Sequence, residues 1–164
     1  MEIDFAYADK KRLSELMPRL FDILHKNMNE IAPTGNSYED DYHEWYENVY
    51  PAMQKAPRQM VIMRQGDALV GFFQYYVNDG RFVMEEIQLQ REMHGKGVFE
   101  AFFQWLLPRL PRDVKTVEAY AQQNNLKSQG ILNHLGLERI DVDETVLFFH
   151  YRGDFGVFSK CFDK

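Results

Sequence analysis

The stretch from residue 82 to residue 107, FVMEEIQLQREMHGKGVFEAFFQWLL, constrains the fold of this chain more than any other segment. Apolar residues with two adjacent carboxylates at its start indicate a strand, and the glycine-bearing run His94-Gly95-Lys96-Gly97 indicates a loop. From Val98 onward, apolar residues recur at helical spacing. A strand, a glycine loop and a helix start, in that order, direct several backbone N–H groups and the positive end of a helix dipole at one point. The segment therefore predicts an anion site, and phosphate is the usual anion at such a site.

Alternative interpretations of the glycine loop follow from its spacing. Two glycines before a helix are also typical of a tight turn that binds nothing. The Rossmann dinucleotide pattern requires a third glycine, which the chain lacks at that spacing. The P-loop pattern is excluded as well, because Lys96 lies between the glycines and no Ser or Thr follows it.

A second informative segment spans residues 117–137. Its first residues predict a strand, Asn124-Asn125 ends that strand, and helical spacing returns over residues 126–135. Gly136 suits the left-handed backbone that ends many helices. The segment therefore predicts a second strand–turn–helix unit.

Together the two segments resemble two motifs of the GNAT superfamily of N-acetyltransferases. Residues 85–98 are similar to the fourth strand and pyrophosphate loop of that family, with Gly95 and Gly97 at its two small positions. Residues 125–137 are similar to its later motif, which has an Asn, a small residue, an apolar pair and a terminal Gly-Phe. The chain departs from the family pattern at four positions: Glu92, Phe99, Leu132 and Leu137.

The resemblance implies a fold, a reaction and a coenzyme. The fold is α+β, with a central mixed, mostly antiparallel sheet of about seven strands flanked by about four helices, in one GNAT-like domain over residues 1–164. The reaction is transfer of an acetyl group from acetyl-coenzyme A to a primary amine, by direct attack in a ternary complex. The residues implied in coenzyme binding are Ile87, Gln88 and Leu89 for the pantetheine arm, His94, Gly95, Lys96, Gly97, Val98 and Phe99 for the pyrophosphate, and Asn125 and Ser128 for the lower arm.

Proton transfer is the chemical requirement of such a reaction. An alkylammonium has a pKa of about 10.4, so forming the attacking amine at neutral pH costs roughly 4–5 kcal/mol. Glu85 matches the strand position at which many relatives carry a glutamate base, and a surface glutamate is the alternative interpretation. Many relatives place a tyrosine acid at the position of Leu132, so Tyr120 or a water would have to protonate the thiolate here. A non-catalytic relative, which binds coenzyme A as a sensor or works as a protein-interaction module, is the alternative function.

The resemblance places the acceptor against residues 29–50, where acids and rings alternate. These rings could hold a cation, although an amphipathic helix with its rings in the core explains the same pattern. Small amines and protein amines both fit as acceptors, and the oligomeric state, a homodimer included, is open.

Composition bounds the remaining classes. A net charge of -6 argues against nucleic-acid binding, and no run approaches the ~18 apolar residues of a membrane span. The five histidines are scattered along the chain, so no metal site is expected. Cys161 is the one cysteine and cannot form an internal disulfide, so a reducing, cytoplasmic location is expected.

The rest of the chain predicts further elements. Strands are expected at residues 1–7, 59–64 and 68–77, the last closing a hairpin through Asn78-Asp79-Gly80, and a final pair near 138–142 and 145–152. Helices are expected after Asp9 and after Ser37, with Pro18 kinking or breaking the first.

Overall fold

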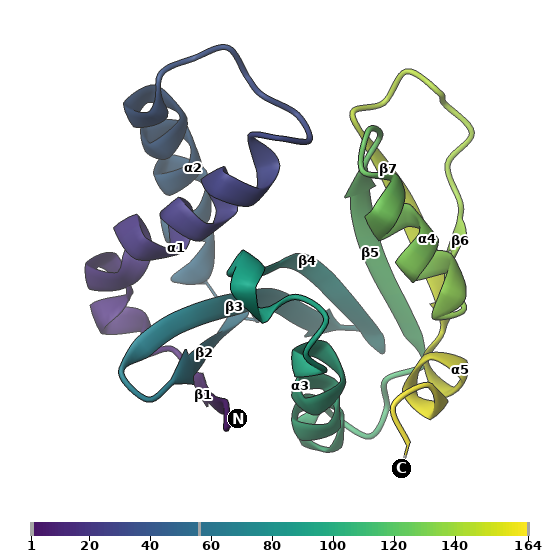
Figure 1. The fold of residues 1–164 in the computed structure, drawn as a ribbon. Helices are drawn as coiled ribbons and strands as arrows, with labels where there is room; N and C mark the ends of the chain where they lie inside the picture. The colour runs from purple at the N-terminus through teal and green to yellow at the C-terminus, as the bar shows by residue number, and fades with distance from the viewer. Residues whose placement is uncertain (1, 56, 164) are drawn as a thin grey trace. The chain divides into compact units, whose positions relative to one another are not determined.

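The computed structural model describes residues 2–55 and 57–163, and Figure 1 labels its helices and strands along the chain. Met1, where the first strand was expected to begin, lies outside the described residues. The strands are β1 (Asp4–Tyr7), β2 (Gln59–Gln65), β3 (Ala68–Asn78), β4 (Arg81–Leu89), β5 (Thr116–Gln122), β6 (Glu138–Arg139) and β7 (Phe148–Asp154). The helices are α1 (Leu13–Met28), α2 (Tyr38–Met53), α3 (Val98–Leu106), α4 (Leu126–His134) and α5 (Phe155–Lys160), with short 3-10 turns η1 (Lys10–Arg12), η2 (Arg91–Met93) and η3 (Leu107–Arg109).

The strands form one mixed sheet in the order β1-β2-β3-β4-β5-β7-β6. β1 pairs with β2, β5 with β7 and β6 with β7 in antiparallel fashion, whereas β4 pairs with β5 in parallel. The turn between β3 and β4 has positive φ at both Asp79 (51°) and Gly80 (74°), as a tight two-residue hairpin turn requires. The predicted mixed α+β sheet and its central hairpin are thus confirmed.

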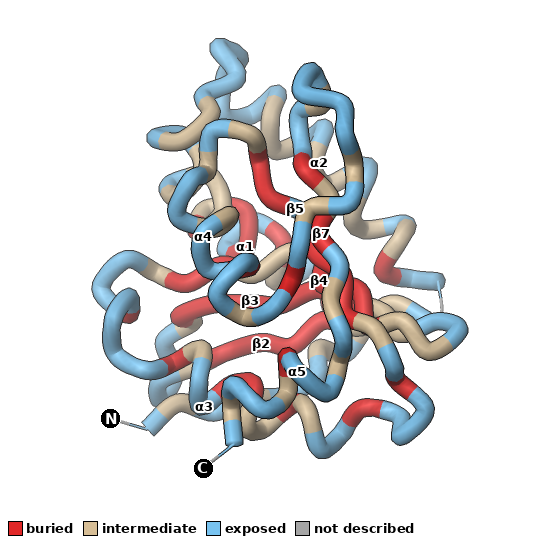
Figure 2. Tube along the Cα trace, turned by 90° about the vertical axis from the view of Figure 1, so that its right-hand side faces the viewer, coloured by how far each residue is buried: buried red, intermediate tan, exposed pale blue. Residues whose placement is uncertain are grey.

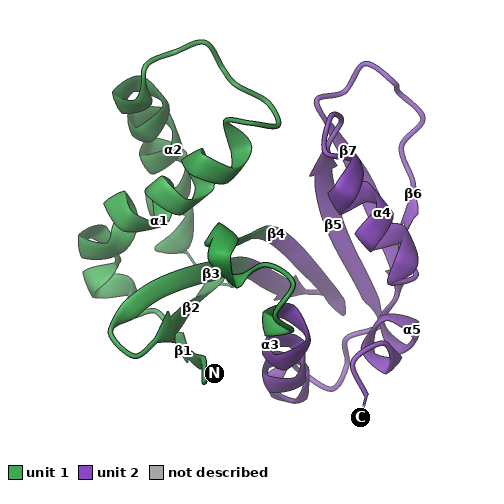
Figure 3. Ribbon diagram, in the orientation of Figure 1, with its two compact units in different colours: residues 1–74, 86–98 green, residues 75–85, 99–164 purple. Residues whose placement is uncertain are grey.

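The chain divides into two compact units (Figure 3). Unit 1 comprises residues 1–74 and 86–98, and unit 2 comprises residues 75–85 and 99–164. Figure 2 shows that the buried residues concentrate in the strands, with β2, β3 and β4 buried over most of their length.

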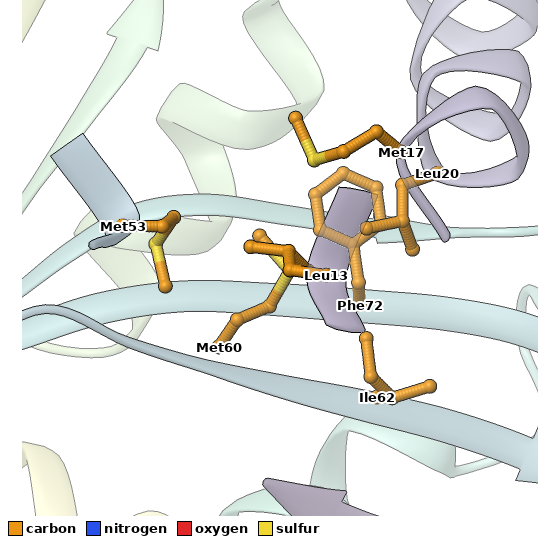
Figure 4. Packing of buried hydrophobic residues seen from close by; sticks show 7 residues of the cluster. All are labelled: Leu13, Met17, Leu20, Met53, Met60, Ile62 and Phe72. Atoms are coloured by element: carbon orange, nitrogen blue, oxygen red, sulfur yellow. The ribbon is translucent and has the colours of Figure 1, made fainter. Parts of the chain in front are cut away.

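Unit 1 has a core built by the apolar stripe of α1 and the strands beside it (Figure 4). Leu13, Met17 and Leu20 recur at helical spacing, so one face of α1 is fully buried. The other members of this core cluster are Met53, Met60, Ile62 and Phe72.

The sequence predicts a cap for each helix of unit 1 and a kink or break of the first helix at Pro18. The Ser37 hydroxyl accepts from Asp40 N at 3.1 Å and caps α2 as predicted. The Asp9 carboxylate accepts from Lys11 N and caps the 3-10 turn η1, whereas α1 itself begins after Arg12 without a side-chain cap. Helix α1 runs through Pro18 without a break. The missing N–H of Pro18 removes one hydrogen bond, and the packing of the buried stripe on either side keeps the segment helical.

Half-buried aromatic residues of α2 pack against the core of unit 1. Tyr42 and Trp45 each place their ring centroid 5.4 Å from that of Phe21 on α1. Tyr46 stacks on Tyr50 at 5.1 Å. The acids of this helix are exposed except Asp41, which is half-buried, so the amphipathic-helix interpretation fits the structure.

Unit 2 packs α3 and α5 together through aromatic rings. Phe158 of α5 lies 6.3 Å from Phe82 of β4 and 5.4 Å from Phe103 of α3, measured between ring centroids. Helix α5 was not expected, although Asp154 caps it in the ordinary way by accepting from Val157 N. The final strand pair was placed wrongly at its turn: β6 ends at Arg139 and β7 begins at Phe148, so the intervening residues connect the strands rather than extend them.

Gly71 of β3 lies where no side chain fits, and we expect Gly71→Ala to be destabilising. An added Cβ would lie 2.5 Å from Gln88 O and 2.7 Å from Leu89 Cδ2, which forces the β4 backbone to move. Such overpacking costs about 1–3 kcal/mol of unfolding free energy, measurable by urea denaturation. Gly130→Ala is the matched control, because nothing lies within 4 Å of a Cβ there and the helix should gain roughly 0.5–1 kcal/mol. Equal stability of the two variants would contradict this account.

Candidate functional site

The glycine loop between β4 and α3 has the backbone that the sequence predicts. Gly95 and Gly97 have φ of 74° and 75°, in the region that side-chain-bearing residues rarely adopt. No atom lies within 4 Å of a Cβ built at either position, so these glycines serve the backbone conformation and not close packing. His94, Gly95, Lys96 and Gly97 are all exposed, and α3 begins at Val98. The loop can therefore present main-chain N–H groups to a ligand.

The end of β4 runs beyond its pairing with β5. The β4–β5 ladder comprises four pairs, from Arg81↔Thr116 to Met84↔Ala119. Ile87, Gln88 and Leu89 follow it along β4. Gln88 O lies against Gly71 on the β3 side. These three residues thus include main-chain groups outside the β5 ladder, as a strand-like ligand would require.

Side chains in unit 1 bind the last carbonyl of β4. Asn27 Nδ2 of α1 donates to Leu89 O at 2.8 Å and to Gln88 Oε1 at 2.9 Å. His94 Nε2 donates to the same Leu89 O at 3.2 Å, and Gln88 Nε2 donates to Glu86 Oε1 at 2.7 Å. The Leu89 carbonyl is thus already bonded, and His94 turns back onto the strand.

The second predicted segment places Asn125 and Ser128 at the start of α4 in unit 2. Asn125 Oδ1 accepts from Ser128 N at 3.1 Å, which makes Asn125 the N-cap of this helix. Both residues are half-buried. Glu85 and Phe99 also belong to unit 2, whereas the other residues predicted for the coenzyme belong to unit 1.

Unit 2 contains an ionic cluster that the sequence interpretation missed. Glu118, in the middle of β5, is 0% exposed. Arg81 Nε and Nη2 donate to its two carboxylate oxygens at 2.5 and 3.1 Å, and His150 Nε2 lies 2.7 Å from Oε1. Arg152 adds an ion pair at 3.5 Å. The carboxylate is thus buried but bound from both neighbouring strands.

Hydrogen bonding keeps Glu118 ionised. The bidentate contact with Arg81 is the largest cause that lowers the pKa of Glu118 to about 2, against the opposing effect of burial. The hydrogen bond to His150 lowers the pKa of Glu118 further. The same pair raises the pKa of Arg81 above its ordinary value, so both members are charged at neutral pH.

Tyr120 lies on β5 two residues after Glu118 and contacts His150. Its ring stacks on His150 with centroids 4.4 Å apart and planes 14° apart, and 46% of the residue is exposed. Burial is the first cause that raises the pKa of Tyr120, and the charges of Glu118 and Glu85 add to it. Met84 pairs with Ala119 in the parallel β4–β5 ladder, so Glu85 and Tyr120 are the next residues along the two strands. The raised pKa keeps the Tyr120 phenol protonated at neutral pH.

A signal for this cluster is present in the sequence. Glu118 interrupts an otherwise apolar strand, and a charged residue at such a position needs a partner. Its partners Arg81 and His150 are 37 and 32 positions away, so spacing alone does not identify them. Leu132 is buried and apolar. It stands at the position where the resemblance implies a tyrosine acid.

Known proteins resemble this chain in structure. No family model matches the sequence, and no curated protein matches it significantly. Among solved structures, an acetyltransferase from Thermus thermophilus superposes with a TM-score of 0.71 at 15% identity, covering 94% of this chain and 97% of that one. The PaiA N-acetyltransferase from Thermoplasma acidophilum, solved in complex with coenzyme A, gives 0.71 at 13% identity, with 94% and 99% covered. A protein from Desulfovibrio desulfuricans attributed to the GNAT acetyltransferases gives 0.69 at 13% identity, with 93% and 99% covered. The chain has the GNAT fold.

The GNAT fold agrees with the element order found here and with the motifs that suggested it. Within the described residues, no group of three or more His, Cys, Asp or Glu side chains is arranged to hold a metal ion. Every helix in residues 2–55 and 57–163 is too short or too polar to cross a bilayer.

Proposed function

We propose that this protein is an N-acetyltransferase that transfers the acetyl group of acetyl-coenzyme A to a primary amine by direct attack in a ternary complex. The observation that carries the proposal is the exposed glycine loop at the start of α3, with positive φ at Gly95 and Gly97, in a chain with the GNAT fold. A protein of the same fold is known in complex with coenzyme A.

The coenzyme would bind to the glycine loop and to the end of β4. The pyrophosphate would accept from the main-chain N–H groups of residues 94–99, and Lys96 is exposed and able to supply charge. The pantetheine amides would pair with the β4 backbone at Ile87, Gln88 and Leu89. Because Leu89 O already accepts from Asn27 and His94, a bond to that carbonyl would have to replace one of these donors.

The catalytic groups would be Glu85 and Tyr120. Glu85 accepts a proton from the attacking nitrogen, directly or through water. Tyr120 takes over the role of general acid, because the Leu132 side chain has no ionisable group and the Tyr120 phenol is protonated at neutral pH. The acceptor is a primary amine on a small molecule or a protein. The single cysteine, Cys161, supports a reducing, cytoplasmic location under this proposal.

A second candidate function is a GNAT-fold domain that binds coenzyme A without catalysis, as a sensor or a protein-interaction module. Buried Leu132 favours it, because α4 supplies no acid at that position. Coenzyme binding with no thiol release across a broad amine panel would support this candidate against the enzyme.

Coenzyme binding is tested by thermal and urea denaturation with and without acetyl-coenzyme A. At ~100 times its dissociation constant, the ligand should raise the unfolding free energy by about 2.7 kcal/mol. Absence of any shift at millimolar coenzyme would contradict the proposal.

The matched variants are Gly97→Ala and Gly35→Ala. Both glycines have positive φ (75° and 81°) and open space around a Cβ, so both substitutions strain the backbone alike. Only Gly97→Ala should weaken the coenzyme-induced shift, because Gly35 lies in the loop between α1 and α2. An equal effect of both variants would remove the loop from the binding site.

A further inference from the structure

The position of His150 opposite Tyr120 gives this residue a defined protonation pattern. In the β5–β7 ladder, His150 is directly opposite Tyr120, and Arg152 is directly opposite Glu118. The His150 backbone N donates to Asp141 Oδ2 at 3.0 Å, and its carbonyl accepts from Ile140 N at 2.9 Å. Main-chain bonds on the β6 side and ring stacking on Tyr120 therefore hold the imidazole in place.

The partner of Nε2 determines the tautomer. Glu118 is ionised, and an ionised carboxylate accepts hydrogen bonds but donates none. Nε2 of His150, 2.7 Å from Glu118 Oε1, must therefore carry a hydrogen. In a neutral imidazole the other nitrogen, Nδ1, then has a free lone pair.

Nδ1 is the group that this arrangement leaves for a ligand. Among the described residues it has no hydrogen-bond partner, and the His150 side chain is 23% exposed. The Tyr120 ring stacks on His150, and Glu85 follows Met84, which pairs with Ala119 beside Tyr120. A base, a protonated phenol and a carboxylate thus occur together in unit 2.

We propose that His150 is a second proton acceptor for the attacking amine, and that Glu118 is the positioning residue that fixes its tautomer. This inference rests on the proposed acetyl transfer. Nδ1 takes one proton from the substrate ammonium, while Nε2–H remains bonded to the Glu118 carboxylate. The ionic bonds of Arg81 to Glu118 keep this carboxylate charged without blocking its contact with His150.

The later steps form the amide and release the thiol. The amine nitrogen forms a bond to the thioester carbon, the carbon–sulfur bond breaks, and sulfur takes the proton of the Tyr120 phenol. Glu85 accepts the second proton from nitrogen and returns it to the Tyr120 oxygen. His150 releases its proton to water, so an ammonium and a thioester give an amide, a thiol and one proton.

His150→Gln separates this role from a structural one. The Gln amide can still donate to Glu118, but it cannot take a proton at neutral pH. We expect the variant to keep the melting temperature of the wild type and its thermal shift with acetyl-coenzyme A. Its kcat should fall at least tenfold. The loss should be smaller than the ~10²–10⁴ typical of an acid–base group, because Glu85 remains. His134→Gln, at the exposed end of α4, is the control and should keep full activity.

The second measurement is the ¹⁵N spectrum of the histidine rings, which reports the tautomer without turnover. In the wild type, His150 should have a protonated Nε2 and an unprotonated Nδ1. In Glu118→Gln, Arg81 should hold the Gln oxygen, so the amide hydrogens face His150 and the tautomer should reverse.

Each outcome has one meaning. Full turnover by His150→Gln, a wild-type ring protonated at Nδ1, or loss of the coenzyme shift together with kcat would overturn the inference while leaving acetyl transfer intact. A wild type that releases no thiol with any amine would overturn the proposed function itself, and the catalytic role of His150 with it.

Discussion

Arg81→Met is expected to lower the free energy of unfolding by about 3–5 kcal/mol at neutral pH, because it leaves the Glu118 carboxylate buried without its main partner. Glu118 is 0% exposed, so water cannot replace the two lost hydrogen bonds. His150 and the more distant Arg152 remain, and neither makes a bidentate contact. Urea denaturation of the variant and the wild type measures the difference.

The pH dependence of this effect has a definite sign. The pKa of Glu118 is about 2 in the folded protein and 4.5 for an ordinary glutamate, so its contribution is full above the ordinary value. That contribution, roughly 3 kcal/mol, is lost as pH falls from 4.5 towards 2. In Arg81→Met the depression of the pKa should largely disappear, so the variant and the wild type should converge in stability at acid pH.

Two further variants test the cause of this loss. Arg12→Met removes an arginine from the exposed pair with Glu15, and it should change stability far less than Arg81→Met does. The double variant Arg81→Met with Glu118→Leu should be more stable than Arg81→Met alone, because no buried charge remains. If Arg81→Met were as stable as Arg12→Met, the buried ion pair would have no role in stability.

Glu85→Gln should lower the rate of amine acetylation by about 10²- to 10⁴-fold, with coenzyme binding unchanged. The amide keeps the shape of the side chain but cannot accept the second proton of the attacking nitrogen, so that proton has to pass directly to water. Steady-state kcat with a saturating amine, and the thermal shift with acetyl-coenzyme A, are the two measurements.

Glu86→Gln is the matched control for that prediction. Glu86 is the adjacent acid on the same strand, and its Oε1 accepts from Gln88 Nε2, a bond that a Gln oxygen can also accept. The control should therefore retain activity. Unchanged turnover of Glu85→Gln would remove Glu85 from the mechanism, and equal losses in both variants would indicate a general electrostatic effect of β4.

Local patterns of the sequence were sufficient for most of the fold. The stripe of α1, the cap at Ser37 and the Asp79-Gly80 turn each depend on residues close in the chain, and each is confirmed. The end of the chain was harder to predict. Helix α5 is six residues long, and its buried Phe158 is held by rings from β4 and α3, which no local pattern shows.

In the candidate site too, local features were predictable from the sequence and contacts between distant strands were not. The positive φ values of Gly95 and Gly97 follow from their own residue type, so the loop was predictable. Asn125 was predicted as a coenzyme ligand, and that role stays a prediction, while its capping bond to Ser128 is a local interaction that the spacing also allows. The partners of Glu118 come from two other strands, so the cluster depends on the register of the sheet and could not be read from sequence separation.

The dependence of Glu118 on two strands has a consequence for how the nascent polypeptide matures. Arg81 is made 37 residues before Glu118, but His150 is made 32 residues after it. Until β7 has left the ribosome, the carboxylate has only part of its final set of donors, and withdrawing it from water is correspondingly unfavourable. Burial of Glu118 with its full set of donors therefore requires β7, and a chain that ended before β7 would lack the contacts of His150 and Arg152.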